Sequence, residues 1–330
     1  MFKNPAIMLA PLAGYTDPPF RTLCFEFGAD YAETEMISSE GLVRGCGRTA
    51  KLMEIIEEEG KVGIQLFGSR PSSMAEAARI ASGRGPAFID INFGCPVKKV
   101  VRKNGGAGLM RDLQLMGRIA EEVVNAVELP VTAKIRSGWT GGQENYLEAG
   151  RVLQGSGIAA VTLHPRYRSQ MFRGEANWAH ITRLNSELDI PVIANGDING
   201  PDDYREVVER TGCGVVMVGR GAMGRPWIFS ELKREMRRMA GCGEEDPSYL
   251  QEPPVPESLS EKLKIFEKFV RMEVEYKGER LAVLELRKHY RWFIRGYRGI
   301  KEYRARLAES ETMEEVLSIL QQIREEIDGK

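Results

Sequence analysis

The sequence contains few of the residues that metal sites and disulfide frameworks need. Its 330 residues include five cysteines and three histidines. The cysteines are odd in number, far apart along the chain and never arranged as a Cys-x-x-Cys pair. Neither a zinc site nor a set of structural disulfides is expected from such a pattern. We therefore predict no bound metal.

A long hydrophobic run is also missing. No apolar stretch reaches the roughly 18 residues that a membrane-spanning helix requires. The apolar start of the chain is interrupted by Pro5, Pro11, Pro18 and Pro19, and no charged segment followed by a long apolar one marks it as a secretory signal. We expect a protein without a membrane segment that works in the cytoplasm.

Charge of one sign is not in excess either. The formal net charge is −1, with 28% charged and 42% hydrophobic residues. This composition is typical of an ordinary globular protein and says nothing about an acidic or basic partner. Any argument for nucleic-acid binding has to come from local clusters of charge. No protein partner is predicted.

Short apolar runs that alternate with amphipathic segments are the dominant pattern. Each run has seven or eight residues, often rich in Val and Ile, and most end at Gly or Pro, as buried parallel strands do. Eight strands with helices between most of them predict an α/β fold, a (β/α)8 TIM barrel, over residues 1–243, with an open doubly wound sheet as the alternative. The expected strands are 6–12, 29–35, 62–68, 88–94, 131–138, 159–165, 191–197 and 214–220.

The composition changes after the predicted barrel. Residues 244–258 contain four prolines and read as a linker. From residue 259 to 330 the pattern is helical and highly charged, which predicts a small helical bundle as a second domain.

Polar residues stand at the expected carboxyl ends of the strands, where barrel active sites lie. Gln65 and Asn92 are neutral hydrogen-bonding groups suited to an amide-rich ring. Lys134 is a cation inside an apolar strand, so it needs a function or a partner. It could stabilise negative charge on a reduced flavin or an enolate, form a Schiff base, or pair with an acid such as Glu35.

Glycine-rich turns follow the last two expected strands. Gly219 to Gly224 form a literal Gly-x-Gly-x-x-Gly, but they follow the eighth strand rather than the first, which argues against a dinucleotide fold. In a barrel, the loops after strands seven and eight form a phosphate site. Arg220 would add a permanent cation, whereas glycines that merely turn the chain are the alternative.

Cys95 is the most distinctive group, because it lies between Gly94 and Pro96 at the end of a strand. A buried, inert thiol is the commonest fate of cysteine. Here the thiol is followed by a basic segment, 98–111, that includes Lys98 and Lys99 and reads as a mobile flap. Its cations could attract a polyanion or lower the thiol pKa; a solvated loop is the alternative.

Several motifs together resemble the tRNA-dihydrouridine synthases. They occur in family order over nearly the whole chain: MLAPLAGYTDPPFR, QLFGSRP, INFGCPVKKVVRKNGGAGLMR, AKIRSGW, HPRYRSQMFRGEANW, IANGDI, GRGAMGRPWIF and LRKHYRWFIRG. The cysteine motif is the most specific of them. In LHPRYR, Pro165 departs from the family pattern, although His164 and both arginines are kept.

The resemblance implies an FMN-dependent barrel that reduces uridine in tRNA with NADPH or NADH. Reduced flavin would supply a hydride from N5 to C6 of uracil, and Cys95 would donate the proton to C5. Asn92 and Arg166 would contact the substrate. The residues implied to hold FMN are Pro11, Leu12, Ala13, Gln65, Lys134, His164, Asn195, Gly196, Asp197, Gly219 and Arg220.

A basic, aromatic stretch in the helical domain fits a tRNA partner. Residues 287–306 contain eight Lys or Arg and one acid. Basic groups bind phosphates and aromatic rings stack on bases, which makes Arg287, Lys288, Arg291 and Arg295 candidate RNA contacts. Among the interleaved aromatics, which include Tyr297, we expect Trp292 and Phe293 to pack in the bundle core.

Three alternative functions remain open on the residues alone. One is a flavin barrel that acts on a free pyrimidine, similar to dihydroorotate dehydrogenase, but it would not need the basic stretch. Another is a Schiff-base aldolase, which would leave Cys95 without a role. The third is an RNA-binding protein without catalytic activity.

Overall fold

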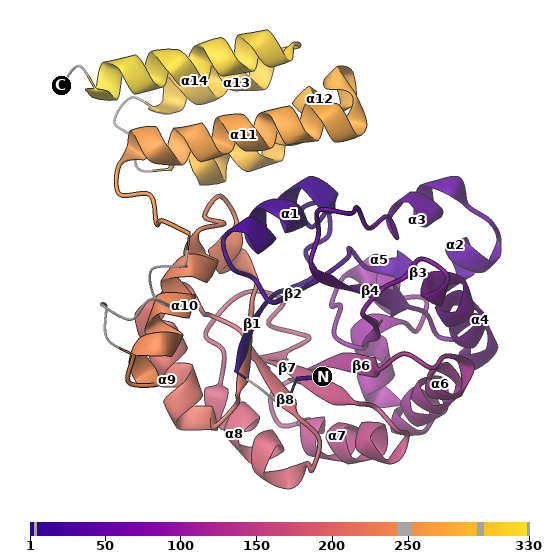
Figure 1. The fold of residues 1–330 in the computed structure, drawn as a ribbon. Coiled ribbons are helices and arrows are strands. Elements are labelled where there is room, and N and C mark those ends of the chain that lie inside the picture. The colour runs from indigo at the N-terminus through magenta and orange to yellow at the C-terminus, as the bar shows by residue number, and fades with distance from the viewer. Residues whose placement is uncertain (3–4, 243–252, 296–299, 329–330) are drawn as a thin grey trace.

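The structure is a computed structural model, and it describes residues 1–2, 5–242, 253–295 and 300–328. Eight parallel strands close into a barrel, and helices surround it (Figure 1). Closure follows from the pairing of the second strand with the strand at Lys61–Phe67, since both neighbours of every barrel strand are then present. The expected fold class, a TIM barrel followed by helices, is confirmed, and the open sheet is excluded.

The barrel strands begin and end close to the expected positions. A further short strand, β3 (Ile37–Ser38), pairs outside the ring with the end of the third barrel strand and is not expected from the sequence pattern. The eight strands of the ring are β1 (Ala6–Leu9), β2 (Tyr31–Glu33), β4 (Lys61–Phe67), β5 (Phe88–Asn92), β6 (Val131–Gly138), β7 (Ala160–Tyr167), β8 (Val192–Asn195) and β9 (Val215–Val218).

Helices connect the strands and cover the outside of the barrel. Asp112 caps α6 by accepting a hydrogen bond from the Leu115 N–H, and Pro201 is the first residue of α9. The helices of this part are α1 (Pro18–Glu26), α2 (Ser39–Val43), α3 (Gly47–Lys51), α4 (Pro71–Ser82), α5 (Lys98–Val101), η1 (Gly106–Arg111), α6 (Leu113–Ala126), α7 (Tyr146–Gly155), α8 (Trp178–Glu187), α9 (Pro201–Thr211), η2 (Arg220–Ala222) and α10 (Ile228–Met239).

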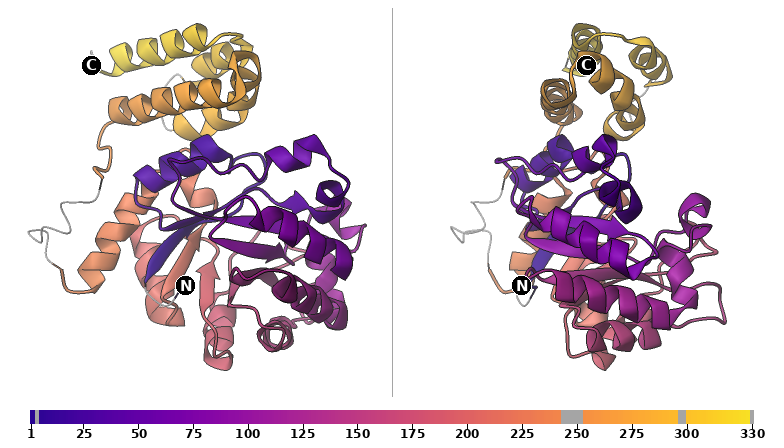
Figure 2. Two further views of the ribbon diagram at one scale, coloured as in Figure 1. Left: turned by 45° about the vertical axis from the view of Figure 1, so that its right-hand side comes forward. Right: turned by 90° about the vertical axis from the view of Figure 1, so that its right-hand side faces the viewer.

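Four further helices form a separate layer beside α1 (Figure 2). They are α11 (Leu259–Lys277), α12 (Glu279–Phe293), α13 (Ile300–Glu309) and α14 (Met313–Asp328). Ser258 and Glu261 form a capping box at the start of α11, which fixes where this layer begins. The predicted linker, 244–258, falls mostly on residues 244–252, which lie outside the described part of the chain, as does Tyr297.

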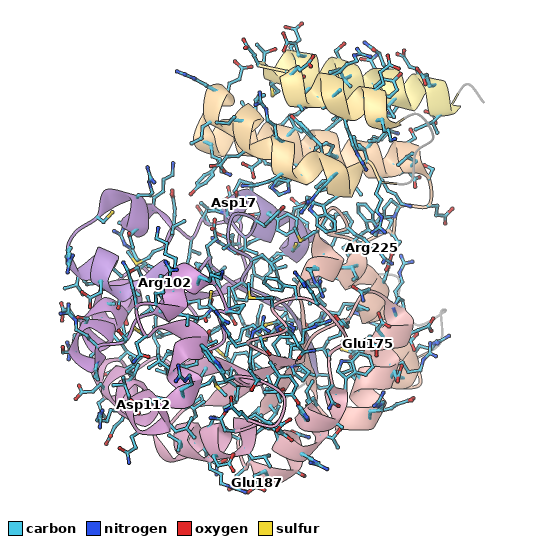
Figure 3. The ribbon with its side chains drawn as sticks, turned by 180° about the vertical axis from the view of Figure 1, so that it is seen from behind. Asp17, Arg102, Asp112, Glu175, Glu187 and Arg225 are labelled. Atoms are coloured by element: carbon cyan, nitrogen blue, oxygen red, sulfur yellow. The ribbon has the colours of Figure 1, made fainter. Side chains whose placement is uncertain are left out.

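A buried cluster joins the helical layer to the barrel. The ring of Phe20 in α1 packs edge-on against Phe269 in α11, and His289 in α12 contacts Tyr15 and Phe20. Lys277 donates to Asp17 at 2.5 Å across the same boundary. Figure 3 labels Asp17 on the side of the barrel that faces these helices. The two parts therefore share apolar and ionic contacts.

Among the described residues, no helix is long and apolar enough to cross a membrane. The same residues contain no group of three or more His, Cys, Asp or Glu that could hold a metal ion.

Candidate active site

A cavity of about 400 Å³ opens at the carboxyl ends of the barrel strands. All eleven residues predicted to hold the cofactor line it, and so do Cys95, Asn92, Arg166 and Arg291. These residues come from loops that are far apart in the sequence. The closed barrel gathers the strand ends into one ring, which is why polar residues that follow different strands meet here.

The cavity is strongly cationic although the whole chain is not. Among the described residues, Asp197 is the only acid that lines it. The cations that line it are Lys134, Arg136, Arg166, Arg220 and Arg291. Burial, together with Lys134 and three of the arginines, pushes the pKa of His164 well below its usual range, so this imidazole is neutral at pH 7. Such a site favours an anionic ligand.

Lys134 reaches the cavity from the middle of β6. Its ammonium group donates to the Asn195 Oδ1 at 2.6 Å, and the Asn195 amide donates to the Met217 carbonyl at 2.7 Å. Burial lowers the pKa of Lys134 to about 8, while the nearby Glu33 and Asp90 act to raise it. The alternative pairing with Glu35 is not found, since the Glu35 carboxylate accepts from the Gly14 N–H.

Asp197 organises the part of the cavity that is formed by the loops after β7 and β8. Its carboxylate accepts from the Arg166 guanidinium at 2.6 and 2.7 Å and from Arg220 at 3.1 Å. Arg166 is only 2% exposed and also donates to the backbone carbonyls of Arg173 and Gly174. The predicted substrate contact Arg166 thus lines the cavity, but its bonds tie the loop after β7 to the loop after β8.

Pro165 does not interrupt the strand that carries His164. β7 runs through it to Tyr167, two residues beyond the predicted end. The Arg166 Nη1 lies 3.1 Å from His164 Nε2, which fits a neutral imidazole that accepts from the guanidinium. The departure from the family motif thus leaves His164 facing the cavity.

Cys95 lies at the edge of the cavity, with 9% of its surface exposed. Its backbone N–H donates to Asn92 Oδ1 at 2.8 Å, and its carbonyl accepts from the Ala107 N–H at 3.0 Å. Burial raises the pKa of the thiol, and the nearby Arg136 offsets only part of this. The thiol is therefore protonated at neutral pH.

The basic segment after Cys95, which the sequence predicts as a mobile flap, has regular structure and is partly buried. It folds into α5 and η1, and residues 106–110 are buried. Gly106 has φ +54, and a Cβ there would lie 2.9 Å from the Cβ of Cys95, so glycine allows this segment to pack directly over the cysteine. Lys98 and Lys99 are exposed on α5 and do not line the cavity.

Gln65 and Asn92 belong to a buried network that sequence reasoning finds only in part. The Asn92 amide donates to Gln65 Oε1 at 2.8 Å, while the Gln65 amide donates to Glu33 and Asp90 at 2.9 and 2.8 Å. A signal for both acids is present in the sequence: Glu33 stands two residues before Glu35, and Asp90 two before Asn92. Residues at this spacing on a strand point to the same face.

The helical layer contributes to the cavity through α12. Arg291 and Trp292 line it, so the expectation that Trp292 packs in the bundle core is wrong, while Phe293 is buried as expected. The reason is a close approach: a Cβ on Gly224 would lie 2.4 Å from the backbone of Trp292. The last glycine of the Gly-x-Gly-x-x-Gly run therefore seats α12 on the barrel.

A second cavity of about 680 Å³ lies between the barrel and the helical layer. It shares Asp197, Arg220 and Trp292 with the first, and Arg295 lines it. Figure 3 labels Arg225, another of its lining residues, near the helices. Of the other predicted RNA contacts, Arg287 is exposed on α12 and Lys288 is half-buried beside Glu285; neither lines these two cavities.

Comparison with known proteins identifies the family. The model of the family "Dihydrouridine synthase (Dus)" matches residues 8–328. The chain belongs to the dihydrouridine synthase family. The tRNA-dihydrouridine synthase B of Proteus vulgaris is 38% identical over 319 residues, which is 97% of this chain and 95% of that protein. The protein of the same name from Escherichia coli K12 is 39% identical over 315 residues, 96% and 94% of the two chains.

Solved structures outside the dihydrouridine synthase family share the fold. An old yellow enzyme homologue from Zymomonas mobilis superposes with a TM-score of 0.50 at 12% identity, covering 76% of this chain and 96% of its own. A 2-naphthoyl-CoA reductase gives a TM-score of 0.52 at 10% identity, covering 69% and 50%. These two structures show the fold alone. The family model and the relatives confirm the family expected from the motifs, and they favour an enzyme of this family over the three alternative functions.

Proposed function

We propose that the chain is an FMN-dependent tRNA-dihydrouridine synthase that reduces the C5–C6 double bond of uridine in tRNA with NADPH or NADH. The observation that carries the proposal is the single cavity in which the predicted cofactor residues and Cys95 meet. Relatives named tRNA-dihydrouridine synthase B, similar over nearly their full length, support the same reaction. A cytoplasmic location stays a prediction.

The residues of the cavity fit FMN. Arg220 and the backbone of Gly196 and Gly219 would hold the phosphate, because an arginine and open glycine backbone suit an anion. Lys134 would lie at the edge of the ring that becomes negative on reduction. Gln65 and Asn92 offer hydrogen-bonding groups to its amide-like edge. When bound, the flavin would supply the hydride that is added to C6 of uracil.

The chain itself must supply the proton, and Cys95 is suited to this. A general acid has to hold its proton at the working pH and lie within reach of the substrate atom. Burial keeps the thiol protonated, and the Asn92 side chain fixes the backbone on which the thiol stands. Proton transfer to C5 leaves a thiolate, which Arg136 would stabilise and solvent would reprotonate.

The exposed cations at the end of α12 and just after it would bind the RNA backbone. Arg291 lines the active-site cavity and Arg295 the second one, so both stand beside the path of a uridine that leaves the RNA stack. We propose that α11–α14, with a boundary in 244–258, form the tRNA-binding domain. Tyr290 and Phe293 are buried and do not stack on bases, so the contact there is mainly ionic.

The experiment uses the purified chain, an undermodified tRNA and NADPH. We expect a visible flavin spectrum and formation of dihydrouridine, measured by mass spectrometry of the digested tRNA. Cys95→Ala should bind flavin and oxidise NADPH as the wild type does, but lose nearly all dihydrouridine formation. A preparation that binds no flavin, or a Cys95→Ala enzyme that modifies tRNA at the wild-type rate, would contradict the proposal.

A further inference from the structure

Two acids are buried beneath the active-site cavity. Glu33 on β2 and Asp90 on β5 are 1% and 0% exposed. They flank Gln65 of β4, whose amide group donates to a carboxyl oxygen of each. Thr132 on β6 donates to the other oxygen of Asp90 at 2.6 Å. An ionised carboxyl is costly in such a place unless hydrogen bonds or an opposite charge compensate it.

The two carboxyl groups lie close together, because both accept from the same Gln65 nitrogen, and two adjacent buried carboxylates would repel each other. Burial raises the pKa of both, and the charge of Asp90 raises that of Glu33 further. The hydrogen bonds from Thr132, Gln65 and Glu33 act in the opposite direction on Asp90. Glu33 is therefore the neutral donor, Asp90 is the carboxylate, and the pair carries one negative charge.

This arrangement fixes the orientation of two amides that line the cavity. Both N–H groups of Gln65 are used by the carboxyls, so its oxygen faces Asn92 and accepts the Asn92 N–H. The Asn92 oxygen is then left to accept the backbone N–H groups of Gly94 and Cys95, at 3.1 and 2.8 Å. One chain of hydrogen bonds thus runs from the acid pair to Cys95.

The negative charge also acts on Lys134. Glu33 and Asp90 both raise its pKa against the effect of burial. Loss of the Lys134 charge would itself lower the potential of a bound flavin, so the acid pair has to be tested at a pH well below the lysine pKa of about 8. The charge of the Glu33–Asp90 pair lies deep in the protein and is poorly screened by salt and water. It therefore also acts on the cavity that Lys134 lines.

We propose that Glu33 and Asp90 are positioning residues for the flavin: they fix the orientation of the Gln65 amide, and their one negative charge holds down the reduction potential of the bound ring. The inference rests on the proposed function, because it requires that flavin is bound. The pair does not line the cavity and acts through the Gln65 amide and through its own charge.

The test is the midpoint potential of the bound flavin, measured against a reference dye during slow reduction at pH 6, where Lys134 keeps its charge. Glu33→Gln is the matched control, because an amide replaces the neutral acid and can still donate to Asp90; its potential should equal that of the wild type. Glu33→Gln/Asp90→Asn removes the charge. Asp90→Asn alone is not sufficient, since Glu33 could then ionise and restore it.

In the double variant we expect at least a tenfold shift of the equilibrium toward reduced flavin, a rise of about 30 mV for a two-electron couple. If that variant does not fold, Thr132→Val leaves both acids and removes one bond to Asp90, and a smaller rise is expected. The infrared spectrum of the wild type should show a protonated buried carboxyl that Glu33→Gln lacks.

Three outcomes would overturn the inference alone. The flavin-loaded double variant could have the wild-type midpoint potential, or the potential of Glu33→Gln could rise as far as that of the double variant. The third outcome is a wild type without the infrared signal of a protonated carboxyl. Absence of flavin from the wild-type protein would instead remove the proposed function, and the inference with it.

Discussion

A thiol and an ammonium group share one cavity, and burial moves their pKa values in opposite directions. Burial disfavours the charged form of each, so it raises the pKa of Cys95 and lowers that of Lys134 to about 8. At pH 7 the thiol is thus mostly protonated and the lysine mostly charged. A proton donor such as Cys95 must be protonated, and a cation that stabilises an anion, such as Lys134, must be charged.

The first prediction is the pH dependence of proton transfer. A donor is active while protonated, and the pKa of Cys95 lies above that of an ordinary thiol. The rate at which tRNA oxidises the pre-reduced enzyme should therefore hold through neutral pH and fall only above about pH 8.5. Rapid-mixing measurements of the flavin spectrum would give this profile, and a fall already below pH 7 would contradict it.

Lys134 titrates in a neighbouring range, so the profile needs a control. Cys95→Ser carries a hydroxyl that does not ionise there. Any alkaline loss that remains in this variant reports Lys134 rather than the thiol. We expect the Ser variant to be slower throughout and to lose the part of the alkaline fall that belongs to Cys95.

At the scale of elements, the docking of α12 on the barrel depends on one glycine. Gly224 has φ +66, and a Cβ there would overlap the backbone of Trp292 and Phe293. Backbone atoms cannot rotate away as a side-chain end can. The helix therefore approaches the loop after β9 this closely only because residue 224 has no side chain.

The second prediction compares two glycines. Gly45 has φ +70, and no described atom lies within 4 Å of the position that a Cβ would take. Gly45→Ala therefore measures the cost of backbone strain alone, about 1 kcal/mol. Gly224→Ala adds a backbone clash and should cost a further 1–3 kcal/mol or so. Denaturant unfolding would show the difference, and tRNA affinity should fall only in Gly224→Ala. Equal losses in both variants would argue against the docking role.

His289 makes the same boundary sensitive to acid. Burial lowers its pKa to about 3, and it is packed among Tyr15, Phe20 and Phe269. The unfolded chain binds a proton at this residue below about pH 6.5, while the folded one does not until far lower pH. The stabilisation that comes from the neutral His289 is thus fully present above about pH 6.5 and is lost as the pH falls below it.

The third prediction is a loss of stability in mild acid. Between pH 7 and pH 5 the wild type should lose roughly 2 kcal/mol through His289. His289→Phe keeps an aromatic ring and removes the titration; among the described residues, the His289 Nε2 has no hydrogen-bond partner to lose. Glu273, whose pKa is raised to about 8, titrates in the opposite sense but is present in both proteins. Melting temperatures at the two pH values would show a smaller drop in the variant, and equal drops would contradict the argument.

The sequence predicts a feature correctly where the residues of a single strand or helix determine that feature. Continuous apolar strands such as Val215–Val218 are buried on both faces and identify a parallel barrel. Cys95 and Lys134 stand out because each polar group is exceptional beside an apolar strand. The position of Trp292 is not predictable, because it depends on the contact with Gly224 across 68 residues, which no local pattern encodes.

At the scale of the whole molecule, charge is separated rather than abundant. The chain as a whole has a net charge of −1, yet in the described structure a single acid stands among five cations at the active-site cavity. Exposed Arg291 at the end of α12 and exposed Arg295 just after it continue this surface from the barrel cavity to the second cavity. A polyanion would therefore be oriented by one face of the molecule.

The fourth prediction tests that face by its salt dependence. Each phosphate contact with RNA contributes about 0.7 to 0.9 to the slope of log affinity against log salt, because bound counterions are released. Arg291→Ala/Arg295→Ala should therefore weaken tRNA binding at low salt and reduce the slope by up to about twice that amount.

Arg84→Ala/Arg118→Ala is the matched control: both side chains are exposed, Arg84 in the loop before β5 and Arg118 on α6, and neither lines the two cavities. The control pair removes the same net charge from the molecule, so a slope that falls equally in both variants would assign tRNA binding to total charge instead of to α12. A reduced slope in the first variant alone, measured by filter binding over a series of salt concentrations, would place at least one RNA phosphate beside the helix that also carries Trp292 into the active site.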